Sequence, residues 1–148
     1  MSVDVETRTV IKRPVDVVAR FASDPTNAPK WYKNIARVEW RTEPPMQVGS
    51  ILAFEARFLG RTLRYDYEIV EHVPGERLVM RTSQGPFPMQ TTYTWRSLGP
   101  DSTEMTLRNN GDPAGFSRVV TPMLAGAMRR ANRKDLAKLK HVLQAQRG

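Results

Sequence analysis

The stretch from Asp112 to Gln146 constrains the fold most, because it predicts a long amphipathic helix. Asp112 is a typical N-cap, and Pro113 suits the first helical position, where its missing N–H costs no hydrogen bond. Unbroken, such a helix would be about 50 Å long at ~1.5 Å per residue. Its apolar face needs a partner surface. The apolar residues recur at three- and four-residue spacing: Phe116, Val119, Val120, Met123, Leu124, Ala127, Ala131, Leu136, Leu139 and Leu143.

Pro122 interrupts this predicted helix. Inside a helix, proline removes one hydrogen bond and pushes on the carbonyl four residues earlier, which bends the axis. Thr121 and Pro122 equally suit the N-cap and first residue of a new helix. One kinked helix and two consecutive helices therefore both remain open.

The chain before this helix predicts a sheet, because apolar and polar residues alternate between turn signals. Pro and Gly mark the turns, at residues 44–45, 60, 74–75, 85–86 and 99–100. Two short helices, over residues 15–24 and 24–32, are expected after the first strand. The predicted strands cover residues 3–11, 35–42, 51–59, 61–73, a shorter segment around 78–82, 87–98 and 103–110.

One face of this sheet should be apolar, and the C-terminal helix should cover it. On the second strand Ala36, Val38 and Trp40 are expected to face inward. We predict an α+β fold of a single domain over residues 1–148, in which a curved antiparallel sheet of six to seven strands wraps around the long C-terminal helix.

Composition narrows the class of protein. The chain has no cysteine, which excludes disulfides, thiolate metal sites and a cysteine nucleophile. The first ten residues contain acids and no apolar run, so we expect no signal peptide. No window approaches the ~20 apolar residues that a membrane span needs. A cytoplasmic protein is expected.

Positive charge is concentrated at one end. The net charge is +8, and residues 114–148 hold eight Lys or Arg against a single acid, Asp135. This distribution is typical of a helix whose outer face is solvated. A contact with nucleic acid or an anionic membrane is the alternative.

The order of elements resembles the helix-grip fold of the superfamily that includes START lipid-transfer domains, birch-pollen allergens and polyketide cyclase/dehydrase-like proteins. The segments that carry the resemblance are IKRPVDVVARFASDPTNAPKWYKNI, VGS before the third strand, YEIVEHVPGERLVMRT, TTYTW and the terminal helix. Phe21 and Trp31 mark the helical pair, and residues 74–78 link two central strands. The resemblance implies a cavity for a hydrophobic molecule between sheet and helix, without fixing a function.

Strand parity and the helix stripe predict which side chains line this cavity. Core packing alone also accounts for any one of them. Tyrosine hydroxyls among them need hydrogen-bond partners and could bind a ligand carbonyl. The candidate ligand-binding residues are Phe54, Phe58, Tyr65, Tyr67, Met80, Met89, Thr91, Tyr93, Met105, Asn109, Phe116, Val120, Met123, Leu124 and Ala127.

Catalytic machinery is not evident in the sequence. The strand carboxylates fall on the outward parity, beside arginines: Glu39, Glu55, Asp66, Glu68 and Glu104. His72 and His141 are isolated, so they predict no metal site. No glycine-rich phosphate loop or serine-nucleophile motif occurs. No cofactor is expected, and enzymatic activity stays open.

The leading hypothesis is a binding protein that holds a lipid or polyketide-like molecule. A polyketide cyclase or dehydratase acting through Tyr65, Tyr67 or Tyr93 is the second hypothesis. The third is an interaction protein that contacts anionic partners through the basic helix. The chain is expected to be a monomer or homodimer, and no metal partner is expected.

Overall fold

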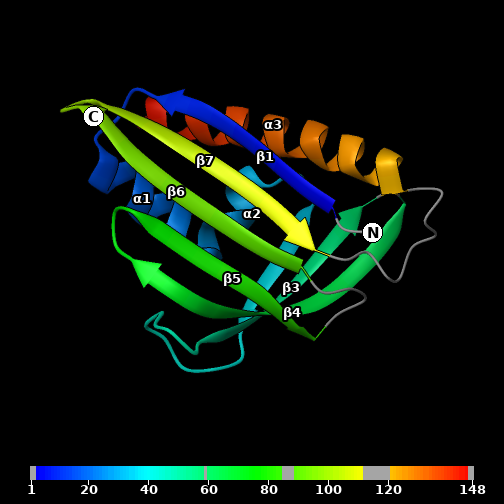
Figure 1. The fold of residues 1–148 in the computed structure, drawn as a ribbon. Helices are drawn as coiled ribbons and strands as arrows, with labels where there is room; N and C mark the ends of the chain where they lie inside the picture. The colour runs from blue at the N-terminus through cyan, green and yellow to red at the C-terminus, as the bar shows by residue number, and fades with distance from the viewer. Residues whose placement is uncertain (1–2, 59, 85–88, 112–120, 147–148) are drawn as a thin grey trace.

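A computed structural model describes residues 3–58, 60–84, 89–111 and 121–146 of the chain. Seven strands and a long helix dominate the fold, with short helices after the first strand (Figure 1). The elements in chain order are β1 (Val3–Ile11), α1 (Val15–Ser23), the 3-10 turn η1 (Pro25–Asn27), α2 (Ala28–Trp31), β2 (Ile35–Trp40), β3 (Ile51–Phe58), β4 (Arg61–Val73), β5 (Arg77–Gln84), β6 (Met89–Gly99), β7 (Ser102–Gly111) and α3 (Thr121–Ala145).

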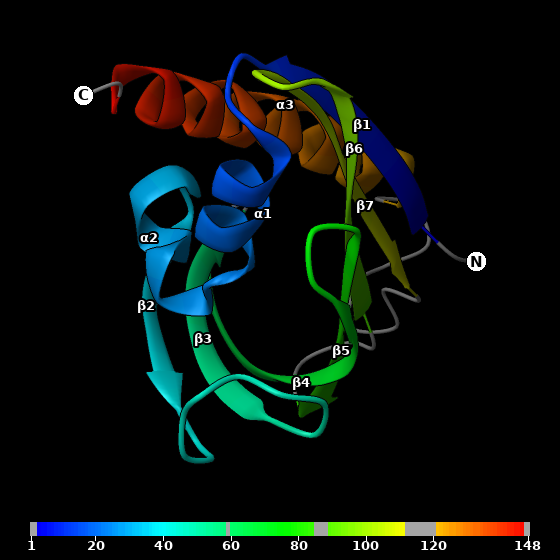
Figure 2. The same cartoon turned by 90° about the vertical axis from the view of Figure 1, so that its left-hand side faces the viewer.

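The strands form one antiparallel sheet in the order β1-β7-β6-β5-β4-β3-β2. From β2 to β7 each strand pairs with its neighbour in sequence, and β1 closes the series beside β7. Figure 2 shows the sheet curving around α1 and α2, with α3 lying near β1. The predicted α+β helix-grip fold is confirmed.

Alternation along the strands is also largely as predicted. On β1, Val3, Val5, Thr7 and Ile11 are buried, whereas Asp4, Glu6, Arg8 and Val10 are exposed. Strand β2 is the exception, because the predicted inward Ala36 is exposed. The register shifts between Ile35 and Arg37, which indicates a bulge at this point. The bulge lets Ile35 face inward.

Three helices cover the concave face of the sheet. The sequence predicted that the C-terminal helix alone would cover it. Val18 of α1 and Trp31 of α2 belong to the same buried cluster as Leu136, Leu139 and Leu143 of α3. The end of α3 is also held by hydrogen bonds, since the Arg13 guanidinium donates to the Leu143 carbonyl at 3.0 Å. The short helices are therefore part of the core.

The described part of the C-terminal helix begins at Thr121, so Pro122 lies in its first turn. Residues 112–120, which the sequence predicts as the start of a longer helix, lie outside the described residues. Along α3, the basic side chains Arg129, Arg130, Arg133, Lys134 and Lys138 are exposed. Within the described ranges, no helix combines the length and apolar character needed to cross a bilayer.

Candidate functional site

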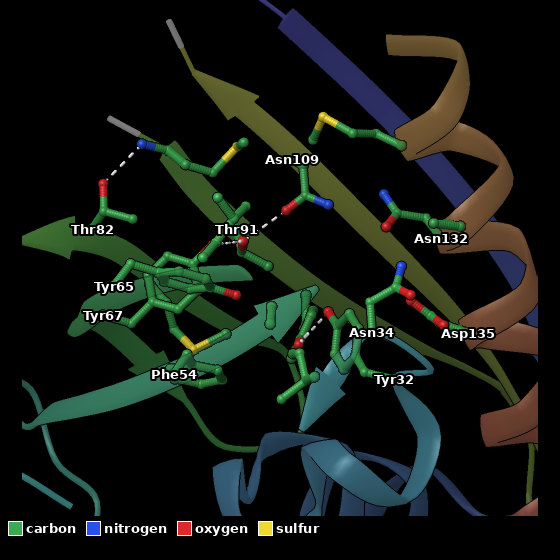
Figure 3. A pocket seen from close by; sticks show the side chains of 18 residues that line it. Tyr32, Asn34, Phe54, Tyr65, Tyr67, Thr82, Thr91, Asn109, Asn132 and Asp135 are labelled. Carbon is green, nitrogen blue, oxygen red and sulfur yellow. Dashed lines mark hydrogen bonds between the residues drawn. The ribbon is translucent and has the colours of Figure 1, made fainter. Parts of the chain in front are cut away.

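A cavity of about 140 Å³ lies between the concave face of the sheet, the chain after α2 and the helix α3 (Figure 3). Its walls are mostly apolar, with polar groups at a few points. The strands contribute Ile35, Phe54, Ala56, Leu63, Tyr65, Tyr67, Met80, Thr82, Met89, Thr91, Tyr93 and Asn109. The segment before β2 contributes Tyr32 and Asn34, and α3 contributes Met128, Ala131, Asn132 and Asp135.

Aromatic rings from β3 and β4 build one wall. Phe54 stands opposite Tyr65 in the strand register, and their rings stack with centroids 5.6 Å apart. Tyr67 meets both rings edge to face, at 5.2 Å in each case. These three side chains fix each other's orientation, so this wall is rigid and apolar except at the phenol oxygens.

A chain of hydrogen bonds crosses the sheet within the cavity. The Thr91 hydroxyl donates to Oδ1 of Asn109 at 2.7 Å, and the hydroxyl oxygens of Tyr67 and Thr91 are 2.6 Å apart. Thr91 has one proton to give, so Tyr67 must donate to Thr91. Burial raises the pKa of Tyr67 to about 12, although the Thr91 contact lowers it in part.

Two phenol groups form a second hydrogen-bonded contact in the cavity wall. The hydroxyl oxygens of Tyr32 and Tyr93 are 2.6 Å apart. The ring of Tyr32 also contacts the indole of buried Trp31, with centroids 4.1 Å apart. Burial is the main cause that raises the pKa of both tyrosines well above the usual range, and the negative charge of Asp135 contributes. Both phenols are therefore neutral hydrogen-bonding groups at neutral pH.

Asp135 of α3 places a carboxyl group in the cavity wall and is only 3% exposed. Its Oδ1 accepts a hydrogen bond from the backbone N–H of Lys33 at 3.0 Å. Burial raises the pKa of Asp135 to about 6, and this hydrogen bond and the charges of Lys138 and Lys33 oppose the shift. Near neutral pH the protonated form of this carboxyl is therefore far more populated than that of a carboxyl with the ordinary pKa of about 4.

Asn132 lies one helical turn before Asp135 and is 5% exposed. Its side-chain nitrogen, Nδ2, is buried and has no hydrogen-bond partner in the described part of the chain. Figure 3 shows this amide pointing from α3 toward the side chain of Asn109 on β7. An unpaired buried donor costs about 1–3 kcal/mol, so this nitrogen is a candidate contact for a ligand.

The structure brings eight of the predicted ligand-binding residues together around the cavity: Phe54, Tyr65, Tyr67, Met80, Met89, Thr91, Tyr93 and Asn109. Met105 is fully buried in the core, and neither Met105 nor Ala127 lines the cavity. The side chains of Phe58, Met123 and Leu124, and all of Phe116 and Val120, lie outside what the structure describes.

The sequence reasoning missed the polar groups that α3 and the chain after α2 supply. Asp135 entered the prediction only as the single acid of the basic segment, yet it lies four residues after Ala131 and four before the buried Leu139. That spacing places it on the apolar face. Asn132 lies four residues after the buried Met128 and four before the buried Leu136, so it also falls on the buried side of the helix. The signal was therefore present in the helical period. Tyr32 gave no comparable signal, because it follows a one-turn helix.

The strand carboxylates behave differently from Asp135. Glu55 is 3.0 Å from Arg64, Asp66 is 3.6 Å from Arg41, and Glu104 is 3.2 Å from Arg96. These ion pairs lie on the outer face, as strand parity predicts. Among the described residues, no group of three or more His, Asp or Glu side chains could hold a metal ion.

The chain matches one family of known proteins over nearly its whole length. Residues 2–144 match the model of the family described as polyketide cyclase / dehydrase and lipid transport. No curated protein matches the chain by sequence.

Several solved structures share the fold. A START superfamily protein from Mycobacterium smegmatis superposes with a TM-score of 0.84 at 14% identity, covering 97% of this chain and 99% of that one. The TTHA0849 protein from Thermus thermophilus gives 0.83 at 17% identity, over 98% and 99% of the two chains. The Zhui aromatase/cyclase from Streptomyces sp. R1128 gives 0.79 at 15% identity, over 97% and 94%. At these identities the likeness concerns the fold alone.

Proposed function

Because the chain belongs to the polyketide cyclase/dehydrase and lipid transport family, we propose that it binds a hydrophobic small molecule, lipid-like or polyketide-like, in the cavity between the sheet and α3. The cavity itself carries the proposal. Its volume is about 140 Å³, whereas one water needs only about 10–15 Å³. Aromatic and methionine walls with a few convergent polar groups are typical of small-molecule sites.

Filling the cavity from the helix side tests the proposal. Ala131 lines the cavity, whereas Ala137 is exposed on the same helix. Ala131→Trp should place an indole in the ligand space and abolish binding, and Ala137→Trp is the matched control that should bind normally. The purified protein is incubated with an apolar cell extract and then examined by native mass spectrometry.

We expect a bound apolar species with the wild type and with Ala137→Trp, and none with Ala131→Trp. Thermal denaturation of both variants checks that they fold. A wild-type protein that retains no apolar species from the extract would overturn the proposal. Unchanged binding by a folded Ala131→Trp variant would place the ligand elsewhere.

A second candidate function is an enzyme of the cyclase or dehydratase type, and Asp135 is the observation that favours it. A carboxyl group with a pKa of about 6 can donate and accept protons near neutral pH. The hydroxyls of Tyr32 and Tyr93 lie near it and could polarise a substrate carbonyl.

A β-hydroxy ketone probe tests this candidate, because its dehydration is seen by mass spectrometry as the loss of one water. Turnover by the wild type should fall at least about tenfold in Asp135→Asn and in Tyr93→Phe, in keeping with the contribution of a general acid–base group. Turnover that both variants retain would exclude these residues as the catalytic groups.

A further inference from the structure

We propose that Asn132 and Asp135 of α3 form a polar subsite that binds a hydroxyl group on the otherwise apolar ligand. The inference deepens the proposed function and rests on it. A single hydroxyl oxygen would accept a hydrogen bond from the Asn132 amide and donate its own proton to the Asp135 carboxylate.

Spacing along the helix supports this arrangement. Residues three apart on an α-helix are neighbours on one face, with Cβ atoms about 5–6 Å apart. One oxygen placed between two such side chains can reach both at ordinary hydrogen-bond lengths of roughly 2.8 Å. Both side chains line the cavity, and both are more than nine-tenths buried.

The unpaired atoms of the Asn132 and Asp135 side chains indicate which ligand group would complete the subsite. Nδ2 of Asn132 is buried and unpartnered among the described residues. Oδ1 of Asp135 is occupied by the Lys33 N–H, and the other carboxyl oxygen accepts no hydrogen bond from the described residues. The subsite therefore offers one free donor and one free acceptor side by side, and a hydroxyl group supplies the complementary acceptor and donor.

Other head groups fit less well. A ligand carboxylate would accept from Asn132 but would be repelled by the Asp135 charge. An ammonium group could pair with Asp135 but has no lone pair for Asn132, and the charges of Lys33 and Lys138 act against it at this carboxyl. A plain hydrocarbon leaves both groups unpaired. The subsite therefore discriminates in favour of apolar alcohols and phenols.

Four naphthalene probes that differ only in their head group test the assignment: naphthalene, 2-naphthol, 2-naphthoate and 2-naphthylmethylammonium. Dissociation constants are measured by isothermal titration calorimetry near neutral pH. The wild type should bind 2-naphthol about tenfold more tightly than naphthalene, the ratio that one to two hydrogen bonds supply. It should bind 2-naphthoate and the ammonium probe more weakly than 2-naphthol.

Variants then assign the preference to the two side chains. Asn132→Leu keeps the side-chain size and removes the amide, so the ratio between 2-naphthol and naphthalene should fall several-fold, to the value that the remaining hydrogen bond to Asp135 supplies. Asp135→Asn removes the negative charge, so binding of 2-naphthoate should strengthen several-fold relative to the wild type. Arg133→Leu is the matched control, because Arg133 is exposed between the two positions. It should leave all four constants unchanged.

Equal binding of 2-naphthol and naphthalene by the wild type would overturn this inference while leaving the proposed function intact. The same holds if a folded Asn132→Leu variant keeps the tenfold preference. Binding of none of the four probes, together with no apolar species retained from a cell extract, would overturn the proposed function and this inference with it.

Discussion

The carboxyl group of Asp135 lies in the cavity wall, and its protonation state affects the stability of the fold. Its pKa rises from 3.8 to about 6 on folding, chiefly because it is buried. Between about pH 4 and 6 the folded chain therefore binds more protons at this group than the unfolded chain does. The contribution of Asp135 to stability is most favourable below this range and is lost as the pH rises through it. Above it, the ionised group costs on the order of 2–3 kcal/mol.

Replacement of Asp135 by Asn should remove this cost while keeping an oxygen that can accept from the Lys33 N–H. We expect the variant to gain about 1–3 kcal/mol of unfolding free energy over the wild type at about pH 8, and much less at about pH 4.5. Urea denaturation at several pH values measures the difference. Asp101→Asn, at an exposed turn, is the surface control and should change the unfolding free energy by less than about 0.5 kcal/mol. A pH-independent gain in Asp135→Asn would contradict the assignment.

Thr91 is the central member of the hydrogen-bond chain between Tyr67 and Asn109. Thr91→Val would leave the Tyr67 hydroxyl and the Asn109 amide oxygen without this partner, in a buried setting. We expect a loss of roughly 1–3 kcal/mol of unfolding free energy. Tyr67→Phe removes a donor at the end of the chain and should cost only about 0.5–1.5 kcal/mol. Denaturant unfolding compares the two, and a larger loss for Tyr67→Phe would show that Thr91 is not central.

Helix α3 is held by a face of leucines, which pack in the same buried cluster as residues of α1 and α2. Leu136, Leu139 and Leu143 are at most 1% exposed. Leu139→Ala should lower the unfolding free energy by about 2–5 kcal/mol, because it removes buried methyl groups and leaves a void. Arg133→Ala, on the exposed face of the same helix, should change it by less than about 0.5 kcal/mol. Chemical denaturation distinguishes the two, and equal effects would mean that the leucine face does not anchor the helix.

The strands were predictable because each has one buried and one outer face, which imposes a period of two on the sequence. The error at Ala36 arose because a bulge changes the parity within a strand, and no residue pattern marked it. The role of α1 and α2 in the core was underestimated, since short helices carry weak periodic signals. For the cavity, strand parity predicted eight side chains that line it in the structure, whereas Met105, of the same parity, lies in the core. Asp135 was not predicted in the cavity wall, because it was considered only in the charge balance of the helix and not by its helical position.

At the level of the whole molecule, the curved sheet gathers every tyrosine of the chain at one place. The sequence holds four tyrosines, Tyr32, Tyr65, Tyr67 and Tyr93, and all of them line the cavity. They come from three separate segments: the end of α2, the strand β4 and the strand β6. Burial is the largest cause raising the pKa of each phenol above 10. Tyrosine ionisation therefore reports on the integrity of the cavity.

Alkaline titration followed by absorbance near 295 nm should show almost no tyrosinate at about pH 10, where free tyrosine is half ionised. The stability that these neutral phenols provide is present below about pH 10 and is lost as the pH rises toward their folded pKa values. Tyrosinate should thus form in one cooperative step, together with unfolding seen by circular dichroism. In concentrated guanidinium the same chain should titrate near pH 10. A gradual rise of absorbance at about pH 10 in the folded protein would mean that at least one phenol is open to water, which contradicts a closed aromatic wall.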